Sequence, residues 1–246
     1  MVYIQGISRT PALDHLDLTA LLNKHPTSPL KAALGAAIAL AVCLLAAVAD
    51  ELGTQKLFER IQKTHGPAAR GRVEGWLKLI AENPSKTDQE KLEIANRYFN
   101  QLDFVEDAEH WGKEDYWATP MEMLVSNGGD CEDFSIAKYF TLRALRVPET
   151  RLRLTYVKSL QLNQAHMVLT YTTEAGAMPL VLDNLIPEIK PASQRPDLQP
   201  VYSFNVEGLW LAKQRGAGRH LGGAEHVDLW KDLLRRMKTQ YDLDLN

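Results

Sequence analysis

Apolar residues recur at helical spacing through most of the chain between residues 51 and 145. Such spacing puts them on one face of a helix, which then packs on a core. Thr87 and Glu90 stand at the spacing of a capping box, which marks the start of one helix. We therefore expect helices at 51–82 with a break at Gly66–Pro67, at 87–101, at 121–125 and, after a turn at 127–130, from Cys131 to about 145.

Beyond Pro148 the apolar and polar residues alternate, as is typical of half-buried strands. Leu152, Leu154 and Tyr156, for example, alternate with charged or polar neighbours. Short polar loops join the stretches, which suits an antiparallel sheet. The pattern predicts strands at 151–157, 166–173 and 180–182, and one or two more within 201–212. Helices followed by strands in this order indicate an α+β fold with an N-terminal helical lobe.

The C-terminal segment carries an apolar stripe that includes Trp230, Leu233 and Met237, with Arg235 and Arg236 opposite. This pattern predicts an amphipathic helix. We expect it to pack on the folded domain, and we favour this over a helix that binds a partner or a membrane surface.

The run Ala32–Ala49 carries no charge and is apolar on every face. Ala47-Val48-Ala49 fits the pattern that precedes signal-peptidase cleavage, here before Asp50. We expect an export leader; a buried core helix and an uncleaved membrane anchor are the alternatives. The expected organisation is a leader at 1–49, a folded domain at 50–212 with a helical lobe up to 126, and a C-terminal tail at 213–246.

Composition narrows the range of functions. The net charge of −3 at neutral pH gives no electrostatic footprint for nucleic acid. The two cysteines are Cys43, inside the apolar run, and Cys131. A disulfide framework is therefore excluded. Cys131 is a lone thiol in the folded part, and its chemistry becomes the main question.

Cys131 follows two glycines and Asp130 and opens a predicted helix. A helix N-terminus carries unpaired N–H groups and partial positive charge, which lower the pKa of a thiol and favour the attacking thiolate. The Cys131 N–H is also placed to bind a developing oxyanion. The commonplace alternative is that Cys131 is a small buried hydrophobe.

A nucleophile needs a base within hydrogen-bond reach, and the base needs a group that orients it. His166 begins one predicted strand and Asp183 ends another, so these ends meet if the two strands are antiparallel neighbours. The residue types, their order and their positions agree with a Cys131, His166, Asp183 triad. Taken singly, His166 could be an ordinary strand residue and Asp183 part of a turn.

These residues lie within longer motifs. The segment 127–133, Asn-Gly-Gly-Asp-Cys-Glu-Asp, resembles the nucleophile motif of the transglutaminase-like cysteine protease superfamily. More narrowly, residues 70–212 are similar to the bacterial transglutaminase-like cysteine proteinases of the LapG type. Four further segments carry the resemblance in the same order: Tyr116–Pro120, Ala165–Leu169, Leu180–Leu185 and Pro200–Asn205.

The resemblance implies a papain/transglutaminase-like core and the same triad of Cys131, His166 and Asp183. It implies a periplasmic cysteine protease that cuts the N-terminal region of a large repeat adhesin of the LapA type between two alanines, and so disperses biofilm. It also implies that an inner-membrane cyclic-di-GMP receptor of the LapD type sequesters the protease.

The resemblance further implies a calcium ion beside the nucleophile, with Asp130 and Glu132 as ligands. Three carboxylates around one thiol would raise its pKa, and Ca²⁺ would offset that effect. Calcium takes six to eight oxygens, so two side chains cannot complete the site, and Glu114 or Asp115 could add to it. Without calcium, the acids would simply complement the helix N-terminus. Trp117 is interpreted as core or pocket wall.

Two other functions remain open at this point. A transglutaminase or a peptidoglycan amidase would use the same triad on another acyl acceptor or substrate. A non-catalytic, calcium-dependent binding protein on a protease scaffold is the second alternative, and an intact Cys-His-Asp set argues against it.

Overall fold

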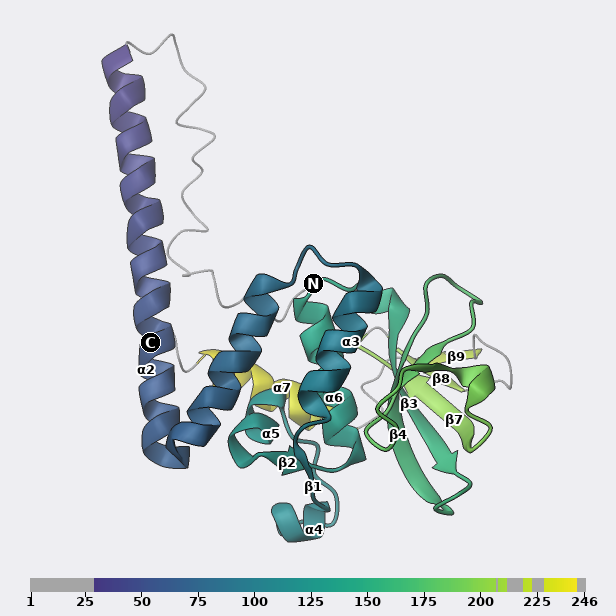
Figure 1. Ribbon diagram of the computed structural model, residues 1–246. Coiled ribbons are helices and arrows are strands. Elements are labelled where there is room, and N and C mark those ends of the chain that lie inside the picture. Colours follow the sequence, from purple (N-terminus) through teal and green to yellow (C-terminus); the bar gives the residue numbers. More distant parts are fainter. Residues whose placement is uncertain (1–28, 207, 212–218, 223–227, 243–246) are drawn as a thin grey trace.

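The computed structural model describes residues 29–206, 208–211, 219–222 and 228–242, with side chains for 52–206, 208 and 228–239. Its first element is helix α2 (Pro29–Glu82), which is bent at Gly66. Gly66 has a φ of 85°, which a glycine adopts without steric cost, and Pro67 begins the second arm of the helix. The predicted break at Gly66–Pro67 is confirmed, and the two arms are visible in Figure 1.

The other helices form the rest of the helical lobe and the C-terminal segment. Capping boxes begin α3 at Thr87 with Glu90 and α5 at Thr119 with Glu122, so local sequence sets both helix starts. The bounds are α3 (Asp88–Phe99), α4 (Asp107–His110), α5 (Pro120–Ser126), α6 (Cys131–Ala144) and α7 (Asp228–Asp242), with short 3-10 turns η2 (Glu149–Arg151) and η3 (Ala192–Gln194).

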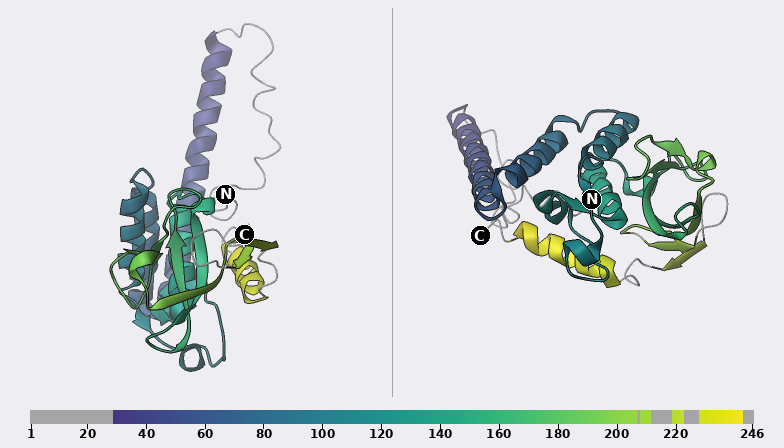
Figure 2. Two further views of the ribbon diagram at one scale, coloured as in Figure 1. Left: turned by 90° about the vertical axis from the view of Figure 1, so that its right-hand side faces the viewer. Right: turned by 60° about the horizontal axis from the view of Figure 1, so that its bottom comes forward.

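Most of the strands form one antiparallel sheet in the order β6-β5-β4-β3-β7-β8-β9. The right-hand view of Figure 2 shows that this sheet is curved. The predicted antiparallel sheet and the α+β class are therefore confirmed. The bounds are β3 (Leu152–Ser159), β4 (Gln164–Tyr171), β5 (Leu180–Leu182), β6 (Lys190–Pro191), β7 (Leu198–Phe204), β8 (Leu209–Leu211) and β9 (Arg219–Gly222).

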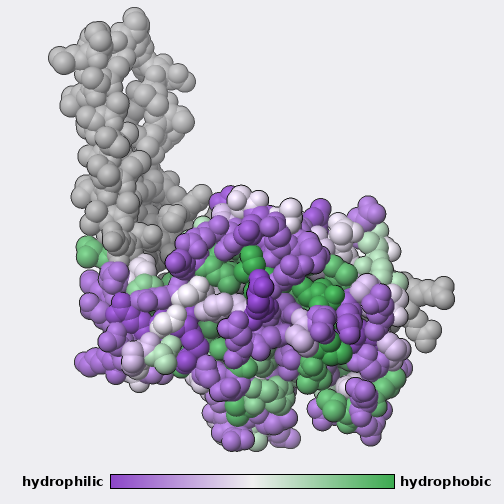
Figure 3. Space-filling model, in the orientation of Figure 1, coloured by the Kyte–Doolittle hydropathy of each residue, from purple (hydrophilic) through white to green (hydrophobic). Residues whose placement is uncertain are grey.

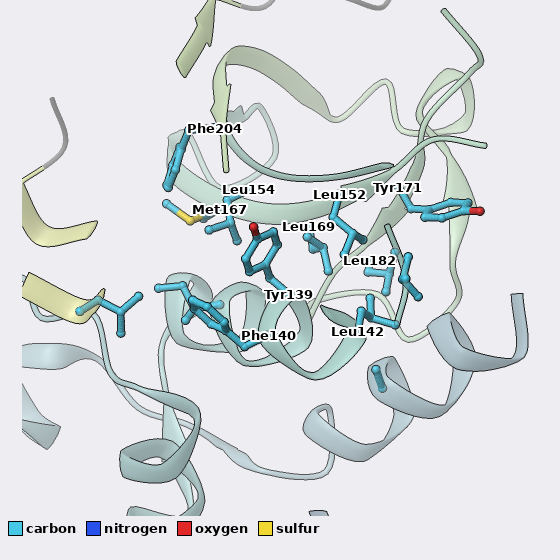
Figure 4. Close-up of a cluster of buried hydrophobic side chains, with 14 of the residues drawn as sticks. Tyr139, Phe140, Leu142, Leu152, Leu154, Met167, Leu169, Tyr171, Leu182 and Phe204 are labelled. Atoms are coloured by element: carbon cyan, nitrogen blue, oxygen red, sulfur yellow. The ribbon is translucent and has the colours of Figure 1, made fainter. Parts of the chain in front are cut away.

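The main core lies between α6 and this sheet. Figure 4 shows Tyr139 and Leu142 of α6 facing apolar side chains of β3, β4, β5 and β7, with Phe140 on the side of the helix toward α7. Full burial of one such leucine or phenylalanine side chain contributes about 1.5–3 kcal/mol. The contact therefore fixes α6, and the residue at its start, relative to the strands.

Helix α7 packs on the same core, as its apolar stripe predicts. Trp230, Leu233 and Met237 are fully buried, and the Trp230 ring stacks on Phe140 with centroids 5.6 Å apart. The sequence pattern places Arg236 opposite the stripe with Arg235, but in the structure it borders the packed face instead, where it is half-buried and hydrogen-bonds the Trp117 carbonyl and the Glu122 carboxylate. The tail helix thus helps to hold the segment before α5.

The visible face is mostly hydrophilic, with apolar patches between charged side chains (Figure 3). Within the part of the chain whose side chains the structure describes, no helix is both long and apolar enough to cross a membrane. The predicted leader at 1–49 lies outside that part, so the export prediction stays a prediction.

A short parallel pair, β1 (Asp103–Phe104) and β2 (Gly128–Gly129), fixes the chain just before α6. A Cβ on Gly128 would lie 2.6 Å from the Asp103 carbonyl oxygen, and one on Gly129 would lie 2.2 Å from Asp133 Oδ2. Gly128 is therefore required by the close approach of the Asp103 backbone and Gly129 by the buried side chain of Asp133, which explains the Gly-Gly pair before Cys131.

We predict that Gly129→Ala lowers the free energy of unfolding by about 2 kcal/mol or more, because the added methyl overlaps Asp133 in a packed site. Urea denaturation measures the change. Gly71→Ala is the matched control: a Cβ there meets nothing within 4 Å, and alanine in this helix should stabilise by about 0.5–1 kcal/mol. Equal stabilities for the two variants would contradict the packing argument.

Candidate active site

Cys131 is the first residue of α6, and Asp130 is its N-cap. The Asp133 carboxylate accepts hydrogen bonds from the Asp130 N–H at 3.3 Å and the Ala118 N–H at 2.6 Å. Asp133 is fully buried, so these bonds tie the helix start to the segment before α5. The predicted position of the thiol at a helix N-terminus is confirmed.

His166 lies in β4, next to Met167, whose backbone is hydrogen-bonded to helix α6. Ser135, one turn along α6, donates to the Met167 carbonyl at 3.0 Å. The backbone of Met167 also hydrogen-bonds the Cys131 sulfur. These two bonds bring the start of α6 against the strand that carries His166, as the sequence predicted.

Asp183 follows the last residue of β5, which is the antiparallel neighbour of β4. Its Oδ1 lies 2.9 Å from His166 Nε2, and both side chains are buried. Burial acts to raise the pKa of Asp183, but hydrogen bonds from His166, Leu185 and Arg195 outweigh it and lower the pKa to about 2.

The ionised Asp183 carboxylate can only accept a hydrogen bond. His166 Nε2 must therefore carry the proton, and Nδ1 is left as the acceptor nitrogen of the neutral ring. This is the tautomer that a general base beside a thiol requires. Sequence had proposed the pairing of His166 with Asp183, and the structure brings the two groups into contact.

The thiol itself is surrounded by acids. Cys131 Sγ lies 2.8 Å from Glu132 Oε2 and donates to it. Burial, followed by the charges of Glu132 and Asp130, raises the pKa of the thiol well above its ordinary value. The lowering of the thiol pKa expected from the helix N-terminus is therefore outweighed in the protein chain alone, because the thiol is buried and two carboxylates lie close to the sulfur.

The acidic cluster is larger than the sequence indicated. Potential ligand atoms of Asp107, Asp130 and Asp133 lie within 4.8 Å of one another, as do those of Asp107, Asp115 and Glu132. Of the two further acids that the sequence suggested as calcium ligands, Glu114 and Asp115, it is Asp115 that lies in this cluster.

Buried acids this close together repel one another unless a cation or protons compensate. Burial, together with neighbouring acids, raises the pKa of Asp107 to about 6 and that of Asp130 to about 10. Asp107 Oδ1 and Asp130 Oδ1 are buried and have no hydrogen-bond partner. Oxygen atoms of this kind are what a hard cation such as Ca²⁺ binds, so the residues present fit a calcium ion.

Trp117 belongs to the main hydrophobic core. It is 4% exposed, and its ring stacks on Phe204 of β7 with centroids 5.6 Å apart. The interpretation of Trp117 as core or pocket wall is confirmed.

Comparison with known proteins agrees with this geometry. A family model described as bacterial transglutaminase-like cysteine proteinase BTLCP matches residues 78–199. The structure is also similar to that of Legionella pneumophila LapG, at 44% identity and a TM-score of 0.66, covering 75% of this chain and 95% of that chain. The chain belongs to the bacterial transglutaminase-like cysteine proteinases. It is thus a cysteine protease of the LapG type.

Two further LapG structures bear on the acidic cluster. Calcium-bound L. pneumophila LapG matches at 46% identity and a TM-score of 0.63, covering 73% of this chain and 98% of that chain. An EGTA-treated form of the same protein matches at 44% identity, a TM-score of 0.66 and 75% and 97% coverage. No curated protein matches the chain.

Three buried charged residues around the candidate active site could not be identified from the sequence. Asp107 lies in an acidic, aromatic stretch that offered no reason to prefer one acid over another. Arg195 lies in a proline-rich connection, where only the spacing to Asp197 hinted at a pair. Lys138 lies on the buried face of α6 and donates to the Asp183 carbonyl at 3.1 Å. Each acquires its role only from residues distant in the chain.

We predict that Lys138 makes stability rise with pH. Burial lowers the pKa of Lys138 to about 7, so between about pH 7 and 10.5 the unfolded chain binds more protons than the folded protein. Lys138 should therefore contribute an increase of up to about 1.4 kcal/mol per pH unit to the free energy of unfolding across that window, while Asp130, whose pKa is raised, contributes a slope of the opposite sign. Urea unfolding at pH 7, 8 and 9 measures this slope.

Lys138→Met should reduce the slope, because the folded state no longer excludes a proton there. Lys158→Met, at an exposed position of β3, is the control and should keep the wild-type slope. Parallel pH profiles for wild type and Lys138→Met would refute the prediction.

Proposed function

We propose that this protein is a calcium-dependent cysteine endopeptidase whose triad is Cys131, His166 and Asp183. The observation that carries the proposal is the bond of the ionised Asp183 to His166 Nε2, beside a thiol bonded to the neighbouring backbone of Met167. This arrangement selects the His166 tautomer that can accept the thiol proton. Membership of a cysteine protease family supports the same reaction.

The reaction is acyl transfer to water. His166 Nδ1 takes the proton of Cys131 as the sulfur attacks the scissile carbonyl, and His166 then gives that proton to the leaving amine. A water molecule, activated by His166, hydrolyses the thioester and releases Cys131. Asp183 holds the tautomer and stabilises the imidazolium that forms in each step. The Cys131 N–H, at the helix start, donates to the developing oxyanion.

Asp130 and Glu132 would hold calcium, with Asp107, Asp115 and Asp133 as the further acids of the cluster. Bound Ca²⁺ supplies positive charge that offsets the acids around the thiol. The protein's own contribution is a fixed loop: the Asp133 bonds to Asp130 and Ala118 keep the acids and Cys131 at one helix start. The calcium-bound form of the similar LapG supports this choice of ion.

We further propose a periplasmic location and an adhesin substrate. Support for the location comes from the apolar run 32–49, which ends in a signal-peptidase pattern. The proposed substrate is the N-terminal region of a large repeat adhesin, cut at a di-alanine site. Similarity to LapG supports this choice. On the same basis, a cyclic-di-GMP receptor of the LapD type in the inner membrane is the proposed regulator, so that cleavage would control biofilm dispersal.

We predict that Cys131→Ala and His166→Ala each lower kcat by about 10⁴-fold or more, because attack and proton transfer depend on each other. Asp183→Asn should cost less than Cys131→Ala, because orientation is only part of the rate. The measurement is cleavage of an adhesin N-terminal fragment that contains a di-alanine site, followed by electrophoresis and mass spectrometry.

Thermal melting of the variants is the control for folding, since Cys131→Ala should stay folded. Cleavage by Cys131→Ala at the wild-type rate would show that another group is the nucleophile. If the folded wild type makes no cut in the fragment, with calcium present, the adhesin proposal is wrong.

We predict that calcium stabilises the protein without any substrate present. At a concentration about 100 times the Kd, binding adds about 2.7 kcal/mol, which raises Tm by about 5–10 °C for a domain of this size. The double variant Asp130→Asn, Glu132→Gln should lose the shift. Glu93→Gln, an exposed acid of α3, is the matched control and should keep it. A shift of equal size in the double variant would remove these two acids from the site.

A further inference from the structure

The Asp183 carboxylate accepts hydrogen bonds from His166 and from two further donors outside the triad. Its Oδ1 receives His166 Nε2 at 2.9 Å and the Leu185 N–H at 3.1 Å. Its Oδ2 receives the guanidinium of Arg195 at 2.8 Å. Rotation of the carboxylate therefore breaks bonds at both oxygens, and the bond to Arg195 opposes that rotation on the side away from His166.

We infer that Arg195 is a positioning residue, an inference that rests on the proposed function. Arg195, itself bound to Asp197, holds the Asp183 carboxylate in the orientation that binds His166. Arg195 does not touch the reacting atoms. Its effect on the reaction passes through Asp183 to the imidazole, and so to the proposed general base.

The Arg195 guanidinium is itself held by the carboxylate of Asp197. Its Nε lies 3.0 Å from Asp197 Oδ1, and its Nη2 lies 2.7 Å from Asp197 Oδ2. This two-point contact sets the plane of the guanidinium, because the fork of an arginine matches the two oxygens of a carboxylate. The same Nη2 reaches Asp183, so one nitrogen joins both acids.

The backbone around Arg195 is equally constrained. Its N–H donates to the Ala192 carbonyl at 3.1 Å, and its own carbonyl accepts from Leu198 at the start of β7. The Asp197 carbonyl accepts from Leu160 in the loop after β3 at 2.8 Å. The side chain of Arg195 is 3% exposed and that of Asp183 is fully buried. The charge pair is therefore held by the fold and shielded from water and salt.

Lys138, a second cationic side chain near Asp183, does not duplicate the role of Arg195. Lys138 Nζ donates to the backbone carbonyl of Asp183 at 3.1 Å, as does Asn100 Nδ2 at 2.9 Å. Both bonds fix the backbone of Asp183, and neither reaches its carboxylate. Loss of Arg195 would leave Oδ2 buried without its donor, and the carboxylate would be free to turn away from His166.

The kinetic test compares Arg195→Gln, Arg195→Lys and Asp197→Asn with the wild type on the adhesin fragment. We expect Arg195→Gln to lower kcat at least tenfold with KM within twofold, because Arg195 acts by positioning Asp183 and not by binding substrate. Arg195→Lys keeps the charge but not the fork, and should recover part of kcat. Asp197→Asn keeps the bond to Asp183 and should lower kcat by a smaller factor than Arg195→Gln.

Arg143→Gln is the matched control, because it breaks another shielded ion pair, with Glu149 at 2.6 Å, that does not include Asp183. The inference is wrong if Arg195→Gln lowers kcat no more than Arg143→Gln does, or if the loss lies in KM. If Arg195→Gln does not fold, the other two variants decide: unchanged kcat in both would overturn the inference.

A second readout needs no proteolysis. In protein labelled with ¹⁵N-histidine, the proton of His166 Nε2 that is bonded to Asp183 should give a downfield NMR signal, assigned by its loss in His166→Gln. This signal should weaken or vanish in Arg195→Gln and persist in Arg143→Gln. Its persistence in Arg195→Gln would overturn the positioning role. Wild-type protein that shows the signal but cuts no substrate would instead count against the proposed function alone.

Discussion

Helix α6 packs along strands β3 and β4, and every group of the candidate site depends on this contact. The apolar face of the helix is buried against the sheet, so its first residue, Cys131, reaches the strand that carries His166. Ser135 and Met167 then fix the register of helix and strand through a single buried hydrogen bond. A shift of one residue in this register would move Cys131 along the strand that carries His166 without breaking the secondary structure.

On the other side of the imidazole, the site is organised by fixed charges. Asp183 stays ionised in a buried position because His166, Leu185 and Arg195 supply hydrogen bonds to its two oxygens. A buried carboxylate with these donors is a fixed acceptor, so it selects one tautomer of the ring. The basic side of the site is therefore complete within the protein chain.

The acidic side of the site is different, because Asp107, Asp130 and Glu132 lie close together with no cationic side chain among the groups described there. Such a cluster is costly without positive charge, and it raises the pKa of the thiol that it surrounds. The two sides meet at Cys131. This asymmetry is the physical argument for the proposed calcium ion, and it links the ion to the nucleophile rather than to the base.

The sequence by itself determined the local features. It set the start of α6 at Cys131, the break at Gly66 and the capping box of Thr87 and Glu90, because these follow from spacing and from turn and cap chemistry within a few residues. It also placed His166 near the start of a strand and Asp183 at the end of another, although β4 begins two residues earlier than predicted, at Gln164. Its short motifs also indicated the family. Helix α7 could be predicted as a packed helix for the same reason.

Only the tertiary structure decided which distant charges meet. Arg195 reaches Asp183, Lys138 reaches the Asp183 carbonyl, and Asp107 joins Asp130 across a turn and a short parallel strand pair. No spacing rule predicts such contacts, since each depends on how separate segments pack on α6 and the sheet. The pKa of the thiol is of the same kind: a helix N-terminus lowers it, and only the folded arrangement of burial and acids reverses the sign.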